Sequence, residues 1–343
     1  MNRRIRRILL VALAALLALA GFAFVAKDSV RWAIDVATGS EFVGAGHGSV
    51  TIVIQPGDTG LEVAQELSDA GVTASQGATY REILRRNVEF YPGAYELALG
   101  MGSGEAITAI VGGSARVETK VLIKEGWRSG QIFKALSQTY DVPLKDFEAV
   151  KPADLGLPRA ALNLDGYLFP ATYVFTPKQS AKSMLSAMHQ RMQQELDDLG
   201  VKAEETHRIL TMAALVQREG RNAADFSKMA RVFQNRIDTG MHLQSDATVS
   251  YGVNSKTVAT TAAQRANDNP WNTYLHAGLP AGPISAPGSA AIKAAMNPAK
   301  GDWLFFCTVN LETGETEFNA TYAEHLVSVA KWQAWMAAHP DWK

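Results

Sequence analysis

The chain has 343 residues, of which 47% are hydrophobic and 20% charged, and its formal net charge is −1 at pH 7. This composition is typical of a folded globular protein and excludes a disordered chain. Because four arginines fall within residues 1–7, the remainder is acidic, which excludes a basic, nucleic-acid-binding body. The single cysteine, Cys307, excludes an intramolecular disulfide, and the scattered histidines show no metal-binding spacing.

Residues 8–26, ILLVALAALLALAGFAFVA, contain neither a charge nor a proline. As a helix they would span about 28 Å, close to the hydrocarbon thickness of a bilayer. We therefore predict a transmembrane anchor, preceded by a basic cytoplasmic tail (1–7) and followed by a tether (27–48). A cleaved signal peptide ending near Ala20 is the alternative. In both cases the body of the protein is exported.

Residues 49–118 are expected to form a small α+β module. A β-branched strand and a Pro-Gly turn precede a helix that Thr59 and Glu62 open with a capping box. A second helix is predicted from near Ser103 to Gly112. Residues 119–140 repeat the strand–turn–helix pattern weakly and begin the second domain, 119–343.

The second domain is predicted to be mainly helical. Residues 152–180 are expected to connect to helices at 180–199, 203–219 and 225–239. The Pro/Gly/Asn-rich stretch 267–289 is a long loop, and long structureless loops in compact domains are usually functional. A β-hairpin (303–309 and 316–319) and a helix over 322–337 follow.

The helix predicted over 203–219 carries a carboxylate, Glu219, where its apolar stripe should continue. The residues that share this face are Ile209, Met212 and Val216. Burial among aliphatic side chains raises the pKa of a carboxyl group, which keeps part of it protonated near neutral pH, as a general acid in glycosidic cleavage requires. The alternative is an ordinary helix-end charge, although Arg218 and Arg221 project to other faces of a regular helix.

The sequence contains the blocks AALVQREG, VFQNRIDTGMHLQSDATVSYG, LDGYLFPATY (164–173), WNTYLHAGLPAGPISAPG (271–288), NPA (297–299) and FNATYAEH (318–325). These blocks, in their order along the chain, resemble the YceG-like (MltG) family of endolytic murein transglycosylases. The resemblance covers essentially the whole chain. It implies an α+β fold class: a single N-terminal transmembrane helix, a small LysM-like α+β module at 49–118, and a YceG-like catalytic domain of helices with short β-hairpins at 119–343.

The resemblance implies that Glu219 is the catalytic residue. It matches the second acid of the family's E-x-E pattern, whereas Gln217 replaces the first. On a regular helix Gln217 lies away from the face of Glu219, so we expect it to act in a supporting or surface position. Ala247 and Ala281 stand where the family usually has proline, which should change loop stiffness and not chemistry.

The implied reaction cuts the β-1,4 bond between N-acetylmuramic acid and N-acetylglucosamine within a strand and leaves a 1,6-anhydro end. If the sugar's own 6-hydroxyl attacks, Glu219 can serve first as acid and then as base, with no second carboxylate, cofactor or metal. An inactive peptidoglycan-binding scaffold of a cell-wall synthesis complex is the alternative. A conventional two-carboxylate hydrolase would use Asp246 as well.

Substrate binding is expected from polar and aromatic residues of the same blocks, namely Gln244, Asp246, Thr248, Tyr251, Asn272, Thr273, Tyr274 and His325. Several have structural alternatives. Asp246 could bond backbone amides of a turn before a strand, Asn272 and its neighbours could support the loop, and His325 could cap the terminal helix. Tyr167 and Phe169 are expected in the core or wall of the site, and Trp271 could stack on a sugar or wedge the loop.

The expected partners are peptidoglycan glycan strands, peptidoglycan synthases and the membrane, through residues 8–26, with no nucleic acid. The expected location is the bacterial inner membrane, with a single pass and the catalytic body in the periplasm.

Overall fold

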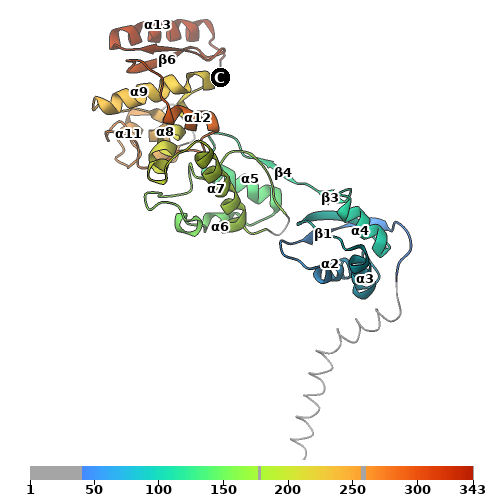
Figure 1. Cartoon of the computed structure of the whole chain (residues 1–343). Coiled ribbons are helices and arrows are strands. Elements are labelled where there is room, and N and C mark those ends of the chain that lie inside the picture. The colour runs from blue at the N-terminus through green and yellow to red at the C-terminus, as the bar shows by residue number, and fades with distance from the viewer. Residues whose placement is uncertain (1–40, 177–178, 256–259, 343) are drawn as a thin grey trace, which may run out of the picture. The chain divides into compact units, whose positions relative to one another are not determined.

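A computed structural model describes residues 41–176, 179–255 and 260–342 (Figure 1). The described chain forms two compact units. One extends to Thr119 and includes Phe175 and Thr176, and the other contains the rest from Lys120 onward. The predicted tail, anchor and most of the tether (1–40) lie outside the described residues. No helix within the described ranges is long and apolar enough to span a membrane.

The first unit is a three-stranded antiparallel sheet with three helices. The sheet order is β1-β2-β3, and Ile52 in β1 pairs with Tyr95 in β2. The capping box of Thr59 and Glu62 is present, as predicted. Its elements are β1 (His47–Ile54), α2 (Gly60–Asp69), α3 (Gln76–Arg86), β2 (Gly93–Leu99), α4 (Ser103–Val111) and β3 (Arg116–Val117).

The core of this unit forms where apolar side chains of the sheet meet those of α2 and α4. Ile52, Leu67 and Tyr95 are almost completely buried there. Burial of this apolar surface stabilises the unit by about 25 cal/mol per Å² removed from water. The assignment of the unit as LysM-like stays a prediction.

The second unit begins with two short strands that pair across a long connection. β4 (Lys120–Leu122) is antiparallel to β5 (Thr172–Val174). Between them lie α5 (Ser129–Tyr140), α6 (Leu144–Glu148) and a 3₁₀ turn (Pro152–Leu155). Tyr167 and Phe169, in the segment before β5, are both buried, in line with a core position.

The three central helices end within a few residues of their predicted bounds. They are α7 (Ala181–Asp198), α8 (Thr206–Glu219) and α9 (Phe226–Asp238), with 3₁₀ turns at Ala203–Glu205 and Ala223–Asp225. All residues from Ile209 to Val216 are buried, so α8 is enclosed on every side and does not carry one apolar stripe. α12 (Ser289–Met296) packs against both α8 and α9 (Figure 1).

The segment after Gln244 is helical and not extended. α10 (Asp246–Gly252) begins at Asp246, which corrects the expected turn before a strand. The carboxylate lies in the first turn, where the positive end of the helix dipole favours it. α11 (Ala262–Arg265) follows.

The end of the chain matches the prediction. β6 (Phe305–Asn310) and β7 (Glu315–Asn319) form an antiparallel hairpin, and α13 (Tyr322–Ala338) packs on β6 (Figure 1). The fold is thus a mixture of helix and sheet, as expected.

Candidate active site

Glu219 is the last residue of α8. The helix is buried up to Val216, and its backbone leaves the helical conformation at Gly220. A side chain at position 220 would collide with the ring of Phe226, so glycine is required for the close turn into the next helix. The fixed helix therefore places the Glu219 side chain at the edge of the core.

The Glu219 carboxyl group is partly buried and held by the segment before α10. Ser245 Oγ donates a hydrogen bond to Glu219 Oε1. Burial raises the pKa of Glu219, and the nearby negative charge of Asp246 raises it further, while Ser245, the Ala247 amide and Arg218 act in the opposite direction. The pKa is raised on balance, which increases the protonated fraction of the carboxyl group, and the protonated form is the one that can donate a proton.

Asp246 lies beside Glu219 and is bound by two hydroxyl groups. Its Oδ1 accepts hydrogen bonds from Thr260 Oγ1 at 2.5 Å and from Tyr274 Oη at 2.9 Å. Burial, the bond to Asp246 and the charge of Glu219 raise the pKa of Tyr274 to about 12. Tyr274 thus remains a hydrogen-bond donor at neutral pH and joins the long loop to the two carboxylates.

Arg236 of α9 brings a permanent positive charge to the same site. Its Nη1 donates to Leu243 O at 2.6 Å and its Nε to Leu304 O at 2.7 Å. Burial lowers the pKa of this guanidinium, and the charge of Glu219 offsets part of that effect. Two backbone carbonyl groups therefore fix a cation within electrostatic reach of Glu219.

His325 reaches the site only through Arg236. Its ring stacks on Phe305 with centroids 5.2 Å apart, and Arg236 lies 5.4 Å from the centroid of that same Phe305 ring. Burial and Arg236 both lower the pKa of His325. Thr321, with Glu324, caps α13, so His325 does not perform the capping role considered for it.

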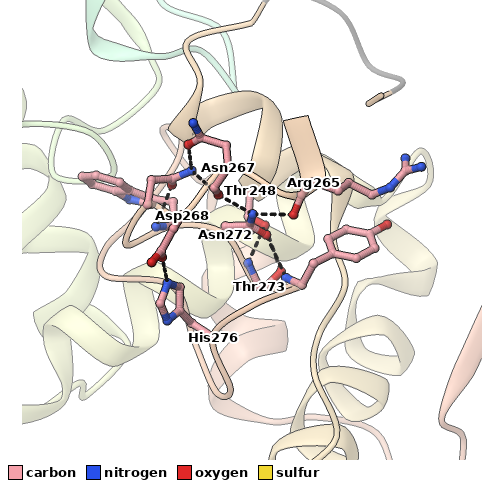
Figure 2. Close-up of polar contacts among 10 residues, drawn as sticks. Thr248, Arg265, Asn267, Asp268, Asn272, Thr273 and His276 are labelled. Atoms are coloured by element: carbon pink, nitrogen blue, oxygen red, sulfur yellow. Dashed lines mark hydrogen bonds and ion pairs between the residues drawn. The ribbon is translucent and has the colours of Figure 1, made fainter. Parts of the chain in front are cut away.

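The long loop predicted at 267–289 is organised by Asn272 (Figure 2). Asn272 Nδ2 donates to Arg265 O at 2.9 Å and to Asn267 O at 2.7 Å, and its Oδ1 accepts from Tyr274 N at 3.0 Å. The side chain is fully buried. All its polar groups are thereby satisfied inside the protein.

Thr273 connects this loop to the residue that binds Glu219. Its Oγ1 accepts from Ser245 N at 3.1 Å and lies 2.8 Å from Thr248 Oγ1, while its carbonyl accepts from Gln244 N at 3.0 Å. Thr273 and Thr248 are fully buried and lie together in Figure 2. The loop thus fixes Ser245, and through it the carboxyl of Glu219.

Three of the expected substrate-binding residues are therefore inside the protein. Asn272, Thr273 and Thr248 have no exposed surface, so we reassign them from direct sugar contact to support of the loop. Gln244 is exposed, with a positive φ of 49°, and remains available to a ligand, as does part of Tyr274.

Tyr251 belongs to a neighbouring cluster. Its hydroxyl donates to Asp165 Oδ2 at 2.7 Å and accepts from Asn163 Nδ2 at 2.7 Å. Its ring lies 5.3 Å from that of Trp271 and 5.0 Å from the guanidinium of Arg128. No described contact joins Tyr251 to Glu219 directly, and the Trp271 ring packs against the Tyr251 ring of α10.

Gln217 supports the loop from the other side of α8. Its Oε1 accepts a hydrogen bond from Gly288 N at 3.0 Å. An acceptor is sufficient for this contact, and a glutamine provides it without a charge.

Ser245 and Arg236 are functional candidates that the sequence analysis did not single out. Both lie within the blocks quoted for the resemblance, but they are separated from Glu219 by many positions. Only the fold brings them together. Among the residues that the structure describes, no group of three His, Cys, Asp or Glu side chains is arranged to hold a metal ion.

Comparisons with known proteins agree on one family. The model of the YceG-like family matches residues 52–331. An endolytic murein transglycosylase of Bacillus subtilis (strain 168) is 29% identical over 300 residues, which is 81% of this chain and 83% of that protein. One from Streptococcus pneumoniae serotype 2 is 32% identical over 181 residues, but this chain spans only 33% of its length.

A solved structure is also similar. The crystal structure of a YceG-like protein from Listeria monocytogenes superimposes with a TM-score of 0.55 at 27% identity, and the match covers 82% of this chain and 99% of that one.

Proposed function

The chain belongs to the YceG-like family, and from this premise we propose that it is an endolytic murein transglycosylase. It would cleave the β-1,4 bond between N-acetylmuramic acid and N-acetylglucosamine inside nascent peptidoglycan strands. The observation that carries the proposal is the partly buried Glu219 carboxyl group, whose pKa is raised by burial and which Ser245 orients. The names of the relatives support the substrate class.

In the first step, protonated Glu219 acts as the general acid. It donates its proton to the glycosidic oxygen as the bond from that oxygen to C1 of the muramic acid breaks, and the N-acetylglucosamine leaves with a free 4-hydroxyl. Positive charge develops at C1. The Glu219 carboxylate that results, together with Asp246, stabilises that charge.

In the second step, the same carboxylate acts as the base. It accepts the proton of the 6-hydroxyl while O6 forms a bond to C1, which closes the 1,6-anhydro ring and restores protonated Glu219. No water is consumed. Tyr274 and Thr260 hold Asp246 in place through this cycle, and Arg236 stabilises Glu219 when it is charged.

Two other functions use the same site differently. The proximity of Asp246 to Glu219 is the observation that favours a two-carboxylate hydrolase, in which Asp246 would activate water or attack C1. A peptidoglycan-binding scaffold of a synthesis complex would retain glycan binding without chemistry. We favour the transglycosylase because two hydroxyl groups already hold Asp246, and one acid, Glu219, is sufficient when O6 attacks.

We further propose that the protein acts at the cell envelope, anchored in the inner membrane by residues 8–26 with its body in the periplasm. The apolar, uncharged character of that segment supports this location. Peptidoglycan synthases are the partners that an enzyme on nascent strands would meet there.

The products separate the three functions. The full chain, purified in detergent, is incubated with polymeric glycan strands, and the ends are identified by mass spectrometry. Internal fragments with 1,6-anhydro ends support the transglycosylase. Fragments with reducing ends support the hydrolase, and strands that bind but remain intact support the scaffold.

A further inference from the structure

Two arginines flank the loop that precedes α5, and neither forms an ion pair with a residue that the structure describes. Arg128 lies directly before that helix, and Arg218 directly precedes Glu219 in α8. The Arg218 guanidinium lies over the loop, with Nη1 3.4 Å from Gly126 O. Burial and the charge of Arg218 lower the pKa of Arg128, whereas the charge of Asp165 raises it.

The acidic residue nearest to Arg128 is already occupied. Asp165 Oδ1 accepts from Ser129 N at 2.5 Å, and its Oδ2 accepts from Tyr251 Oη at 2.7 Å. The Arg128 guanidinium lies 5.0 Å from the Tyr251 ring centroid, and within the described ranges it makes neither an ion pair nor a side-chain hydrogen bond. Its N–H groups are therefore available.

The backbone that carries Arg128 is rigidly held. Gly126 N donates to Ala286 O at 2.7 Å, and Ala286 N donates to Trp127 O at 2.8 Å. A half-buried guanidinium carried by a fixed backbone needs little reordering when it binds a ligand. The charge of Asp165 offsets part of the charge of Arg128, but two adjacent cations still repel each other, and an anionic ligand would relieve this repulsion.

We propose that Arg128 and Arg218 form a subsite for a carboxylate of the peptide that is attached to the muramic acid. This inference rests on the proposed function. In a peptide-bearing strand the lactyl carboxyl group of each muramic acid is bound in the amide to its peptide, so the sugars are neutral and the substrate's negative charge close to an internal bond is on its peptide stems. The two side chains leave the helix in different directions, but the charge of Arg218 reaches Glu219. A stem carboxylate bound here therefore places the strand near the acid, and the subsite selects peptide-bearing strands.

The test compares strands that differ in that charge. The full chain is assayed on strands with free stem carboxylates, on strands whose stem carboxylates have been amidated, and on strands from which an amidase has removed the stems and whose exposed lactyl carboxyl groups have then been amidated. Arg128→Gln, Arg218→Gln and the double variant are compared with wild type. Arg159→Gln, which removes an equally positive, exposed side chain of the same unit, is the matched control.

On strands with free carboxylates, we expect each single variant to lower kcat/KM by about tenfold, mainly through KM, because a charge-assisted hydrogen bond is lost. On amidated and peptide-free strands Arg128→Gln should match wild type, and Arg159→Gln should match it on all strands. Because the charge of Arg218 also acts on Glu219, Arg218→Gln and the double variant are judged by the ratio of kcat/KM on free-carboxylate strands to kcat/KM on amidated strands, which should fall. An equal loss on all three strands, or no loss on the free carboxylates, would overturn the proposal.

A binding experiment keeps this inference separate from the proposed reaction. Affinities of Glu219→Gln for the same three strands are measured with and without Arg128→Gln. Preference for free carboxylates that disappears with Arg128→Gln supports the subsite even if wild type cleaves nothing. Equal affinity for free and amidated stems contradicts it even if wild type is an active transglycosylase.

Discussion

Ser245 Oγ donates a hydrogen bond to Glu219 Oε1, although the two residues are separated by 26 positions. Ser245 is itself fixed by Thr273, whose hydroxyl accepts from the Ser245 amide at 3.1 Å. The orientation of the proposed acid therefore depends on the long loop as well as on α8. The predictions below follow from this arrangement.

Ser245→Ala should move the alkaline limb of the activity profile to higher pH. The acid must be protonated to cleave, so the rate falls as the pH rises through the pKa of Glu219. The Ser245 hydrogen bond stabilises the charged form and lowers this pKa, and its loss therefore raises the pKa. The measurement is kcat/KM against pH. An alkaline limb that moves to lower pH would contradict the assignment.

Asp246→Asn should move the same limb in the opposite direction. The negative charge of Asp246 raises the pKa of Glu219, so its removal lowers that pKa and deprotonates the acid at lower pH. Asparagine retains an oxygen that can accept from Tyr274 and Thr260. The same kcat/KM profile tests this change, and an unmoved limb would show that the two carboxylates are not coupled.

Glu219→Gln should stabilise the fold at neutral pH. The folded-state pKa of Glu219 lies above its ordinary value of 4.5, so the unfolded chain loses this proton first, and stability falls as the pH rises from 4.5 through the folded pKa. The variant avoids this loss. Thermal unfolding should give equal melting temperatures for the variant and the wild type below pH 4.5. At pH 7 the variant should melt at a higher temperature, by about 2 to 4 °C for each kcal/mol of added unfolding free energy. A constant difference at all pH values would refute this.

Asn272→Ala should damage stability and activity together, whereas Tyr274→Phe should mainly damage activity. The buried amide of Asn272 makes three hydrogen bonds, and we expect its removal to cost about 2 to 3 kcal/mol. The Tyr274 hydroxyl contacts only Asp246 among the described side chains. Denaturant unfolding and initial rates are measured on the same preparations. Normal stability in Asn272→Ala would contradict its supporting role.

Local signals predicted much of the fold. The Thr59 and Glu62 capping box, the hairpin at the end of the chain and the bounds of α7 to α9 depend on nearby residues, which the sequence displays directly. A turn before a strand is the structural alternative that the sequence offers for Asp246, but the segment forms α10, which packs against α8. Such tertiary packing overrides weak local preferences.

The site was predicted less completely, because its contacts join distant segments. Glu219 was recognised from its place on an apolar helix. The sequence also marked Asn272 and Thr273 as polar loop residues, but it could not tell a buried support from an exposed sugar contact. Ser245 and Arg236 lacked any local signal that linked them to Glu219, since only the folded chain brings them there.

The most direct test of the account is the rate at which Glu219→Gln forms 1,6-anhydro ends from polymeric glycan strands. Gln217→Glu is the matched control, because a carboxylate at 217 can still accept the Gly288 amide hydrogen bond. We predict that Glu219→Gln binds strands like wild type but forms anhydro ends at least about a hundredfold more slowly, whereas Gln217→Glu remains active. Wild-type rates in Glu219→Gln would contradict the central claim.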